Sequence, residues 1–240
     1  MKVTYVYHSC YVVEFEKEVL VFDYFMGRMP EIDRNKKVYF FASHKHQDHF
    51  DLCIFKFADK YPNITYILSN DIRVSERYLE QNGYSKDIMN KIIFIGKREE
   101  KKIDDLKVET LKSNDIGVAF VVTVAGKCIY HAGDLNWWSL EGDAESRNAN
   151  LEFKYTMEID RLKNRKIDVA FVPLDSRLNT AFYKGIDYFA TTTSAELIFP
   201  MHMWRKYEIV ERLKKSEITK TYRNRIVTVE KENESWVIEE

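Results

Sequence analysis

The sequence predicts an α/β fold in which two β-sheets pack together and carry helices on their outer faces. Strand-like runs fill two blocks of the 240-residue chain, and segments with helical spacing follow each block. The length fits one large α/β domain, and a hydrophobic fraction of 45% is ample for its core. Because the chain contains no repeat and no Gly/Ser/Pro-rich linker, we expect a single domain over residues 1–240.

The first block begins with a meander of three short strands that Asp23 closes. A fourth strand-like run is followed by a segment of near-helical spacing with Asp51 as its N-cap, and a later helix is expected to stop near Gly83. The expected strands span residues 3–7, 11–15, 19–22, 37–42 and 64–68, and the expected helices span residues 52–58 and 71–79.

The second block contains four further strand-like runs, and Ala125-Gly126 marks a turn between the last two. Residues 135–150 are polar and acidic apart from two tryptophans, which suggests a long surface excursion. The expected strands of this half span residues 92–95, 106–111, 117–124, 127–130, 169–172, 197–199 and 225–229, and the expected helices span residues 151–164 and 206–215.

Four candidate metal ligands lie in the loop between the fourth strand and the helix that follows it. They are His44, His46, Asp48 and His49. Zinc and related ions bind neutral imidazole and carboxylate readily, and loops at strand ends are where sites are usually built. The alternative is an exposed polar loop with accidental histidines, but such crowding has no obvious value to a core or to a surface.

Two further strand ends carry residues of the same kind. Gly133-Asp134 follows the strand that ends at Tyr130, and His202 follows the strand at residues 197–199. Taken alone, an Asp after Gly is usually a turn residue, and a histidine at a strand end is usually packing or surface. Together with the histidine loop, they suggest a metal site assembled from three regions of the chain.

Composition narrows the classes of partner. The formal net charge is −1, so no overall field attracts polyanions, and we expect a small-molecule substrate rather than nucleic acid. No apolar run approaches the roughly 18 residues of a membrane-spanning helix, and because residues 2–7 are strand-like we expect no signal peptide. The odd number of cysteines, Cys10, Cys53 and Cys128, suggests free thiols, so we expect a cytoplasmic protein. The sequence does not indicate an oligomeric state.

With these motifs in this order, the chain resembles the metallo-β-lactamase-fold hydrolases, whose pattern is a His-x-His-x-Asp-His loop, a Gly-Asp pair and a late strand-end His. The opening Tyr7-His8-Ser9-Cys10 and Val21-Phe22-Asp23 is similar to the ascorbate-lactonase-like branch of that superfamily. The resemblance implies a four-layer αβ/βα sandwich of two mixed β-sheets flanked by helices, with a two-metal site at the sheet edge.

The resemblance also implies roles for the candidate ligands. His44 and His46 would bind the first metal, Asp48, His49 and His202 the second, and Asp134 would bridge the two.

Three other residues are placed around these ligands by the same resemblance. Asp23 would hold the histidine loop by hydrogen bonds. His8 is either a proton relay or substrate contact, or a histidine satisfied within its hairpin, and His131 is ambiguous in the same way.

This chain departs from the pattern of many members at the third protein ligand of the first metal. Those members supply a histidine there, but no histidine lies between His49 and His131. Asp115, at a junction between two expected strands with Gly117 beside it, is the substitute that we expect. The alternative is that Asp115 only caps a turn. We expect the two divalent ions to be Zn, which binds both imidazole and carboxylate. Mn and Fe are the alternatives, because a carboxylate suits them better than it suits Zn.

Two such ions would activate a hydroxide for hydrolysis of an ester, lactone, amide or phosphodiester, positioned by Asp134 and assisted by Asp48 as proton acceptor. The alternatives are a nuclease or phosphodiesterase acting on nucleic acid and a non-catalytic metal-stabilised binding protein on the same fold. Five residues that follow expected strand ends are candidates for the pocket lining, although each is more often packing or surface: Trp137, Trp138, Arg177, Tyr183 and Trp204.

Overall fold

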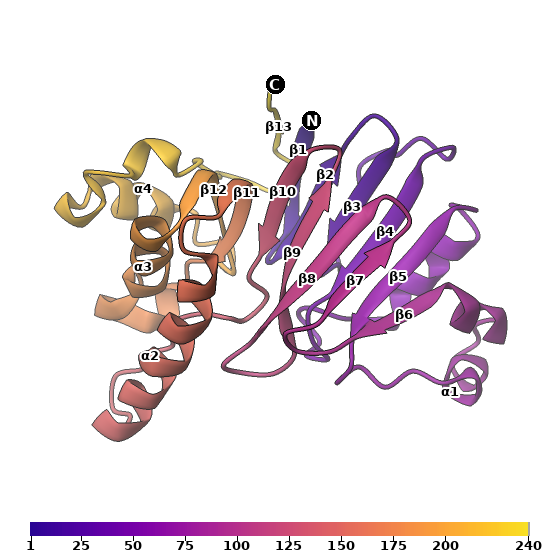
Figure 1. Cartoon of the computed structure of the whole chain (residues 1–240), viewed down its shortest axis with the longest axis horizontal. Coiled ribbons are helices and arrows are strands. Elements are labelled where there is room, and N and C mark those ends of the chain that lie inside the picture. The colour runs from indigo at the N-terminus through magenta and orange to yellow at the C-terminus, as the bar shows by residue number, and fades with distance from the viewer. Residues whose placement is uncertain (240) are drawn as a thin grey trace. The chain divides into compact units, whose positions relative to one another are not determined.

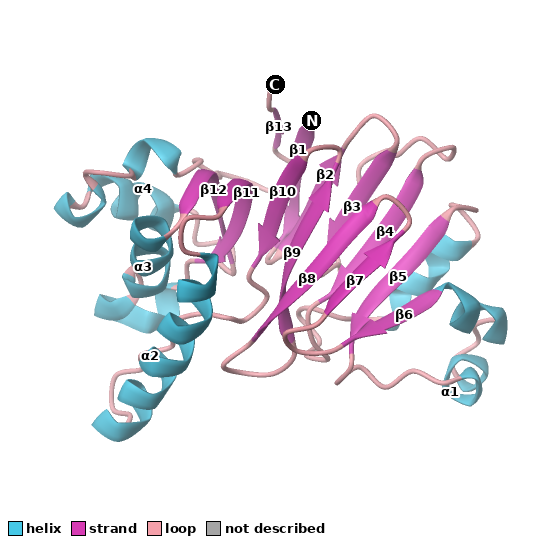
Figure 2. Cartoon of the chain, in the orientation of Figure 1, coloured by secondary structure: helices cyan, strands magenta, loops and turns pink. Residues whose placement is uncertain are grey.

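The strands form two mixed β-sheets, one in each of two units of the chain (Figures 1 and 2). The computed structural model describes residues 1–239. The first unit contains Met1–Gly96 and the C-terminal segment from Glu232, and the second contains Lys97–Lys231. The expected α/β fold with two mixed sheets and flanking helices is therefore confirmed, whereas the single domain over residues 1–240 stays a prediction.

The sheet of the first unit has the order β13-β1-β2-β3-β4-β5-β6. Strands β1 to β3 pair antiparallel, whereas β3 to β6 pair parallel. Its elements are β1 (Lys2–Tyr7), β2 (Cys10–Glu14), β3 (Glu18–Phe22), β4 (Lys37–Ala42), the 3-10 helix η1 (Leu52–Ala58), β5 (Ile64–Ser69), α1 (Glu76–Gln81), the 3-10 helix η2 (Lys86–Lys91), β6 (Ile92–Ile95) and β13 (Ser235–Val237).

The sheet of the second unit has the order β12-β11-β10-β9-β8-β7, with β10 to β12 parallel and the others antiparallel. Its elements are β7 (Glu100–Ile103), β8 (Leu106–Lys112), β9 (Val118–Val124), β10 (Lys127–His131), α2 (Glu145–Ile159), η3 (Asp160–Leu162), β11 (Lys166–Pro173), η4 (Ser176–Ala181), α3 (Lys184–Thr192), β12 (Ser194–Met201), α4 (Glu208–Lys215), η5 (Glu217–Thr219) and η6 (Arg223–Arg225).

Strand direction gathers the candidate residues at one edge of each sheet. The carboxyl ends of strands that run in the same direction meet at the same edge. In the first unit β1, β3, β4 and β5 share a direction, so the loops that follow these strands lie at one edge. In the second unit the same reasoning joins the loops after β8, β10, β11 and β12.

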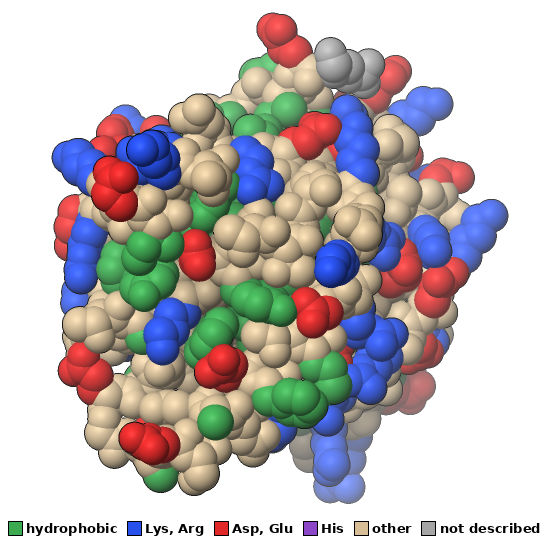
Figure 3. Space-filling view, turned by 60° about the vertical axis from the view of Figure 1, so that its left-hand side comes forward, with side chains coloured by type: hydrophobic (Ala, Val, Ile, Leu, Met, Phe, Trp, Pro, Cys, Tyr) green, Lys and Arg blue, Asp and Glu red, His purple; other side chains and the backbone are tan. Residues whose placement is uncertain are grey.

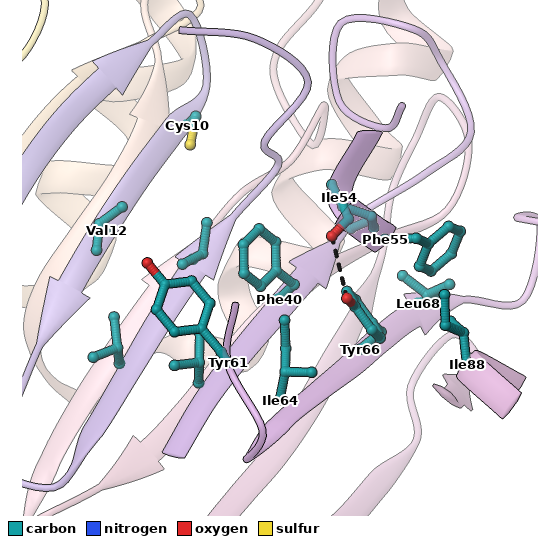
Figure 4. Close-up of a cluster of buried hydrophobic side chains, with 14 of the residues drawn as sticks. Cys10, Val12, Phe40, Ile54, Phe55, Tyr61, Ile64, Tyr66, Leu68 and Ile88 are labelled. Carbon is teal, nitrogen blue, oxygen red and sulfur yellow. Dashed lines mark hydrogen bonds between the residues drawn. The ribbon is translucent and has the colours of Figure 1, made fainter. Parts of the chain in front are cut away.

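Aliphatic and aromatic side chains pack together in the core cluster of the first unit that includes Ile54 and Phe55 of η1 (Figure 4). Phe55 of η1 packs against Tyr66 of β5 with ring centroids 5.0 Å apart, and the Tyr66 hydroxyl donates to the Ile54 carbonyl at 3.2 Å. Asp51 caps η1 as expected, because its side chain accepts from the Cys53 amide. This packing holds the segment that follows the histidine loop against the sheet.

Several expected boundaries are wrong. The helix expected at residues 71–79 forms only over Glu76–Gln81, and α2 begins at Glu145, inside the expected surface excursion. Leu135 and Asn136 in that excursion are buried. Residues 225–229 make only an isolated bridge, Ile198 to Ile226, instead of a strand. The elements that the sequence did not predict include β7, α3 and β13.

Candidate metal centre

Asp23 fixes the histidine loop in the first unit. It follows β3, and its carboxylate accepts from the Ser43 amide at 2.7 Å and the Ser43 hydroxyl at 2.6 Å. The same carboxylate lies 2.7 Å from His49 Nδ1, and all three residues are buried. A carboxylate oxygen only accepts, so Nδ1 of His49 carries the proton and Nε2 presents its lone pair, as metal-binding histidines require.

Asp23 also sets the tautomer of His44, through Ser43. Because the Ser43 hydroxyl donates to Asp23, the His44 Nδ1 at 3.0 Å must donate to that hydroxyl. His44 therefore also presents Nε2, which lies 2.9 Å from His46 Nδ1. The Lys45 amide between them donates to Asp71 Oδ2 at 3.0 Å, which ties the loop to the end of β5.

Asp48 is surrounded by imidazoles. Its Oδ2 lies 3.4 Å from His8 Nε2 and 3.9 Å from His49 Nε2. The three residues each offer a candidate ligand atom within 4.8 Å of the others, and His44 and His46 do the same as a pair. The structure therefore places His8 among the candidate ligands of the first unit, closer to them than the sequence indicated.

His202 occupies an equivalent position in the second unit. It follows β12, and its Nδ1 lies 2.8 Å from Oδ2 of Asp175, a fully buried carboxylate that follows β11. His202 therefore donates from Nδ1, and its Nε2 lies 3.4 Å from Asp134 Oδ1. Burial raises the pKa of Asp175, but hydrogen bonds from His202 and Arg177 outweigh it and hold the pKa below its usual value.

Asp134 and Asp115 bring two carboxylates to the same edge of this unit. Gly133 adopts φ +51°, a conformation that favours glycine, and turns the chain so that Asp134 follows β10. Asp115 lies between β8 and β9 as expected and is exposed. The two residues offer oxygens within 4.8 Å of each other. In this turn the Ser113 hydroxyl accepts from the Asp115 amide at 3.2 Å, and the choice between a ligand and a capping role for Asp115 stays a prediction.

His131 is buried and points at the turn that carries Asp134. Its Nδ1 accepts from the Gly133 amide at 3.1 Å, and its ring packs on Phe171. The contact positions the Gly133 turn. The assignment of His131 as a residue around the ligands stays a prediction.

Three of the five candidates for the pocket lining lie around His202. The Trp138 and Trp204 rings are edge-on to the imidazole at 5.6 and 5.8 Å between centroids, and Arg177 lies over Trp204 while it binds Asp175. The other two pack elsewhere: Trp137 against Tyr155 and Tyr188, and Tyr183 against Phe182.

Three of the residues around the candidate ligands have a positive φ. His8, Asp23 and His202 have φ values of 55°, 45° and 64°, a region that residues other than glycine seldom occupy. Such conformations persist where the surrounding structure over-determines them, and they cluster at functional sites.

The model of the β-lactamase superfamily domain matches residues 2–147, more than half of the chain. The chain belongs to the β-lactamase superfamily. The resemblance to this superfamily is confirmed, whereas its ascorbate-lactonase-like branch stays a prediction. No curated protein matches the chain.

Solved structures show that this superfamily member has the metallo-β-lactamase fold. A metallo hydrolase from Ignicoccus hospitalis, Igni18, has a TM-score of 0.61, 17% identity and 99% coverage of both chains. An isothiocyanate hydrolase from Delia radicum gut bacteria has a TM-score of 0.55, 14% identity and the same coverage. The diiron β-hydroxylase CmlA from Streptomyces venezuelae has a TM-score of 0.53 and 11% identity, and the match spans 84% of this chain and 44% of CmlA.

The donor set of this superfamily member fits divalent metal ions. Nε2 of His49 faces the Asp48 carboxylate, and Nε2 of His202 faces the Asp134 carboxylate. In each pair both groups are hydrogen-bond acceptors with no proton between them, so a cation bound by both would suit the pair. Sequence reasoning missed Asp175, although it follows a strand as Asp23 does.

Among the described residues, no helix is long and apolar enough to cross a membrane.

Proposed function

We propose that the protein is a metal-dependent hydrolase that cleaves an ester, lactone or phosphodiester bond of a small molecule. The observation that carries this proposal is that two histidines at strand ends, His49 and His202, are both held by buried carboxylates with Nε2 facing a second carboxylate. Membership of the β-lactamase superfamily supports the same conclusion.

The ligand assignment follows the order expected from the sequence. His44, His46 and Asp115 would hold one divalent ion, Asp48, His49 and His202 would hold the other, and Asp134 would serve both. Zn suits this mixture of imidazole and carboxylate, and the carboxylate of Asp115 admits Mn or Fe. When bound, such ions lower the pKa of water and polarise the oxygen of the bond under attack.

The residues of the chain supply positioning and proton transfer. Asp23 and Asp175 hold their imidazoles in the tautomer that leaves Nε2 available. The Asp48 side chain is 27% exposed beside His8, so these two residues are suited to accept a proton from the attacking water and pass it on.

Hydrolysis of nucleic acid is less well supported. The formal net charge is −1, and basic and acidic side chains are interspersed on the face shown in Figure 3. A non-catalytic binding protein is disfavoured by the presence of both Asp48 and Asp134.

Metal analysis of the purified protein combined with a screen of ester, lactone and phosphodiester substrates tests the proposal. We expect a chelator to abolish hydrolysis and added Zn, Mn or Fe to restore it. The variant His46→Ala/Asp48→Ala should lose at least about 100-fold in kcat/KM, because loss of a ligand should cost at least as much as loss of a residue that orients one. The exposed pair Glu76→Ala/Lys86→Ala is the control. Activity that survives both chelation and the double substitution would contradict the proposal.

A further inference from the structure

A groove of about 700 Å³ lies beside the histidine loop within the first unit. Lys45 and Gln47 line it, and they alternate along the chain with the candidate ligands His44, His46 and Asp48. The opposite wall comes from residues 70–73 after β5 and from the start of α1. The groove therefore shares a loop with the proposed metal centre.

The carboxylates of the groove are already engaged with the backbone. Asp51 Oδ1 accepts from the Cys53 amide at 2.7 Å, and Asp71 Oδ2 accepts from the Lys45 amide at 3.0 Å. The two cations, Lys45 and Arg73, are exposed, and their side chains form no ion pair with any residue from 1 to 239. The hydrogen bonds hold the two carboxylates in place without removing their charge, and Lys45 and Arg73 are the charged side chains of the groove that can pair with an anion.

Apolar surface accompanies these cations. Phe50, Leu52 and Ile72 line the groove, and Tyr78 lines it with 41% of its surface exposed. Aromatic and aliphatic walls with a few charged groups are typical of sites for small organic molecules.

We propose that this groove binds the non-reacting part of the substrate and selects an apolar or aromatic group that bears a carboxylate or phosphate. Lys45 and Arg73 would bind the anionic oxygens, and Phe50 and Tyr78 would contact the apolar part. This inference rests on the proposed function, because it takes the adjacent histidine loop as the reacting centre.

Ligand binding to the metal-loaded full chain tests this inference without turnover. Phenylacetate and phenyl phosphate are the anionic probes, phenylacetamide is the neutral counterpart of the first, and both affinity and backbone amide shifts are recorded by NMR. We expect the two anions to bind more tightly than phenylacetamide. They should also shift the backbone amide signals of residue 45 and residues 70–73. The variant Lys45→Gln/Arg73→Gln should weaken the binding of both anions about tenfold, because hydrogen bonds to charged groups are the strong ones. Its affinity for phenylacetamide should equal that of the wild type.

The exposed pair Arg77→Gln/Lys86→Gln is the matched control, since it removes the same charges from the same unit outside the groove. Equal anion affinity in the wild type and in the groove variant would overturn the inference, as would equal binding of phenylacetate and phenylacetamide. The tighter of the two anions identifies the group that the groove prefers. Groove binding without metal-dependent hydrolysis would contradict the proposed function alone, and hydrolysis without groove binding would contradict this inference alone.

Discussion

Two buried carboxylates, Asp23 and Asp175, each accept from Nδ1 of a histidine that follows the neighbouring parallel strand. A carboxylate in this position fixes the ring orientation and raises the basicity of the other ring nitrogen. The two residues therefore act on metal affinity through the histidines, as positioning residues.

We expect Asp175→Asn to weaken metal binding about 10- to 100-fold, measured by competition with a chelator. Asn carries no charge but still accepts a hydrogen bond from His202. Ala provides neither, so Asp175→Ala should bind metal more weakly than Asp175→Asn. Asp168→Asn is the matched control, because Asp168 is a buried carboxylate near the other end of the same strand, where it accepts from the Cys128 amide. A loss of metal affinity as large in the control as in Asp175→Asn would show a structural rather than a positioning effect.

A substitution at Asp115 tests whether this residue is a metal ligand or only a turn residue. If it is the third protein ligand of the first metal, Asp115→Ala should lower the affinity of one site at least about tenfold and leave the other unchanged. Ser113→Ala removes the hydroxyl that caps the same turn but leaves the carboxylate, so it should not change metal affinity. Metal titration with both variants decides the point, and two unaltered sites in Asp115→Ala would exclude the ligand role.

At the scale of elements, α3 packs against the turn that follows Asp134. A Cβ added at Gly185 would lie 1.8 Å from Asn136 Oδ1 and 3.3 Å from the Trp137 amide, and Asn136 is buried. The glycine therefore permits close approach of α3 to the residues that follow the candidate ligand.

We expect Gly185→Ala to lower the free energy of unfolding by about 1–3 kcal/mol through overpacking, although Ala is the better helix former. Denaturant unfolding measures the effect. In the background Asn136→Ala the same substitution should cost less, because the clashing oxygen is gone, and the double-mutant cycle should show coupling. Additive effects of the two substitutions would contradict the assigned clash.

At the scale of the whole molecule, the chain leaves its first unit after Gly96 and returns to it at Glu232, and β13 then pairs with β1.

Each of the two units contains at least one free cysteine. Cys10 and Cys53 belong to the first, and Cys128 belongs to the second. Burial raises the pKa of all three thiols, and that of Cys53 to about 12.

We therefore expect thiol labelling of the native protein near pH 8 to be at least about 100-fold slower than that of the unfolded protein, because the thiolate is the reactive form. If residues 1–240 form one cooperative domain, Cys10 and Cys128 should become reactive at the same denaturant concentration. Mass spectrometry of the labelled peptides measures each site. Labelling of one cysteine at a clearly lower concentration than the other would show that the two units unfold separately.

The sequence alone was sufficient for the fold class, for most strands and for the candidate ligands. These features are local: strands show as short β-branched and aromatic runs, and His44, His46, Asp48 and His49 lie within six positions. The tertiary structure decided features that depend on contacts between distant residues. The first two turns of α2 are largely exposed and lack apolar periodicity, and α3 forms despite Gly185 because Ile186 and Phe189 are buried against the sheet. Asp175 orients His202 across 27 positions, a pairing that exists only because β11 and β12 lie side by side and parallel.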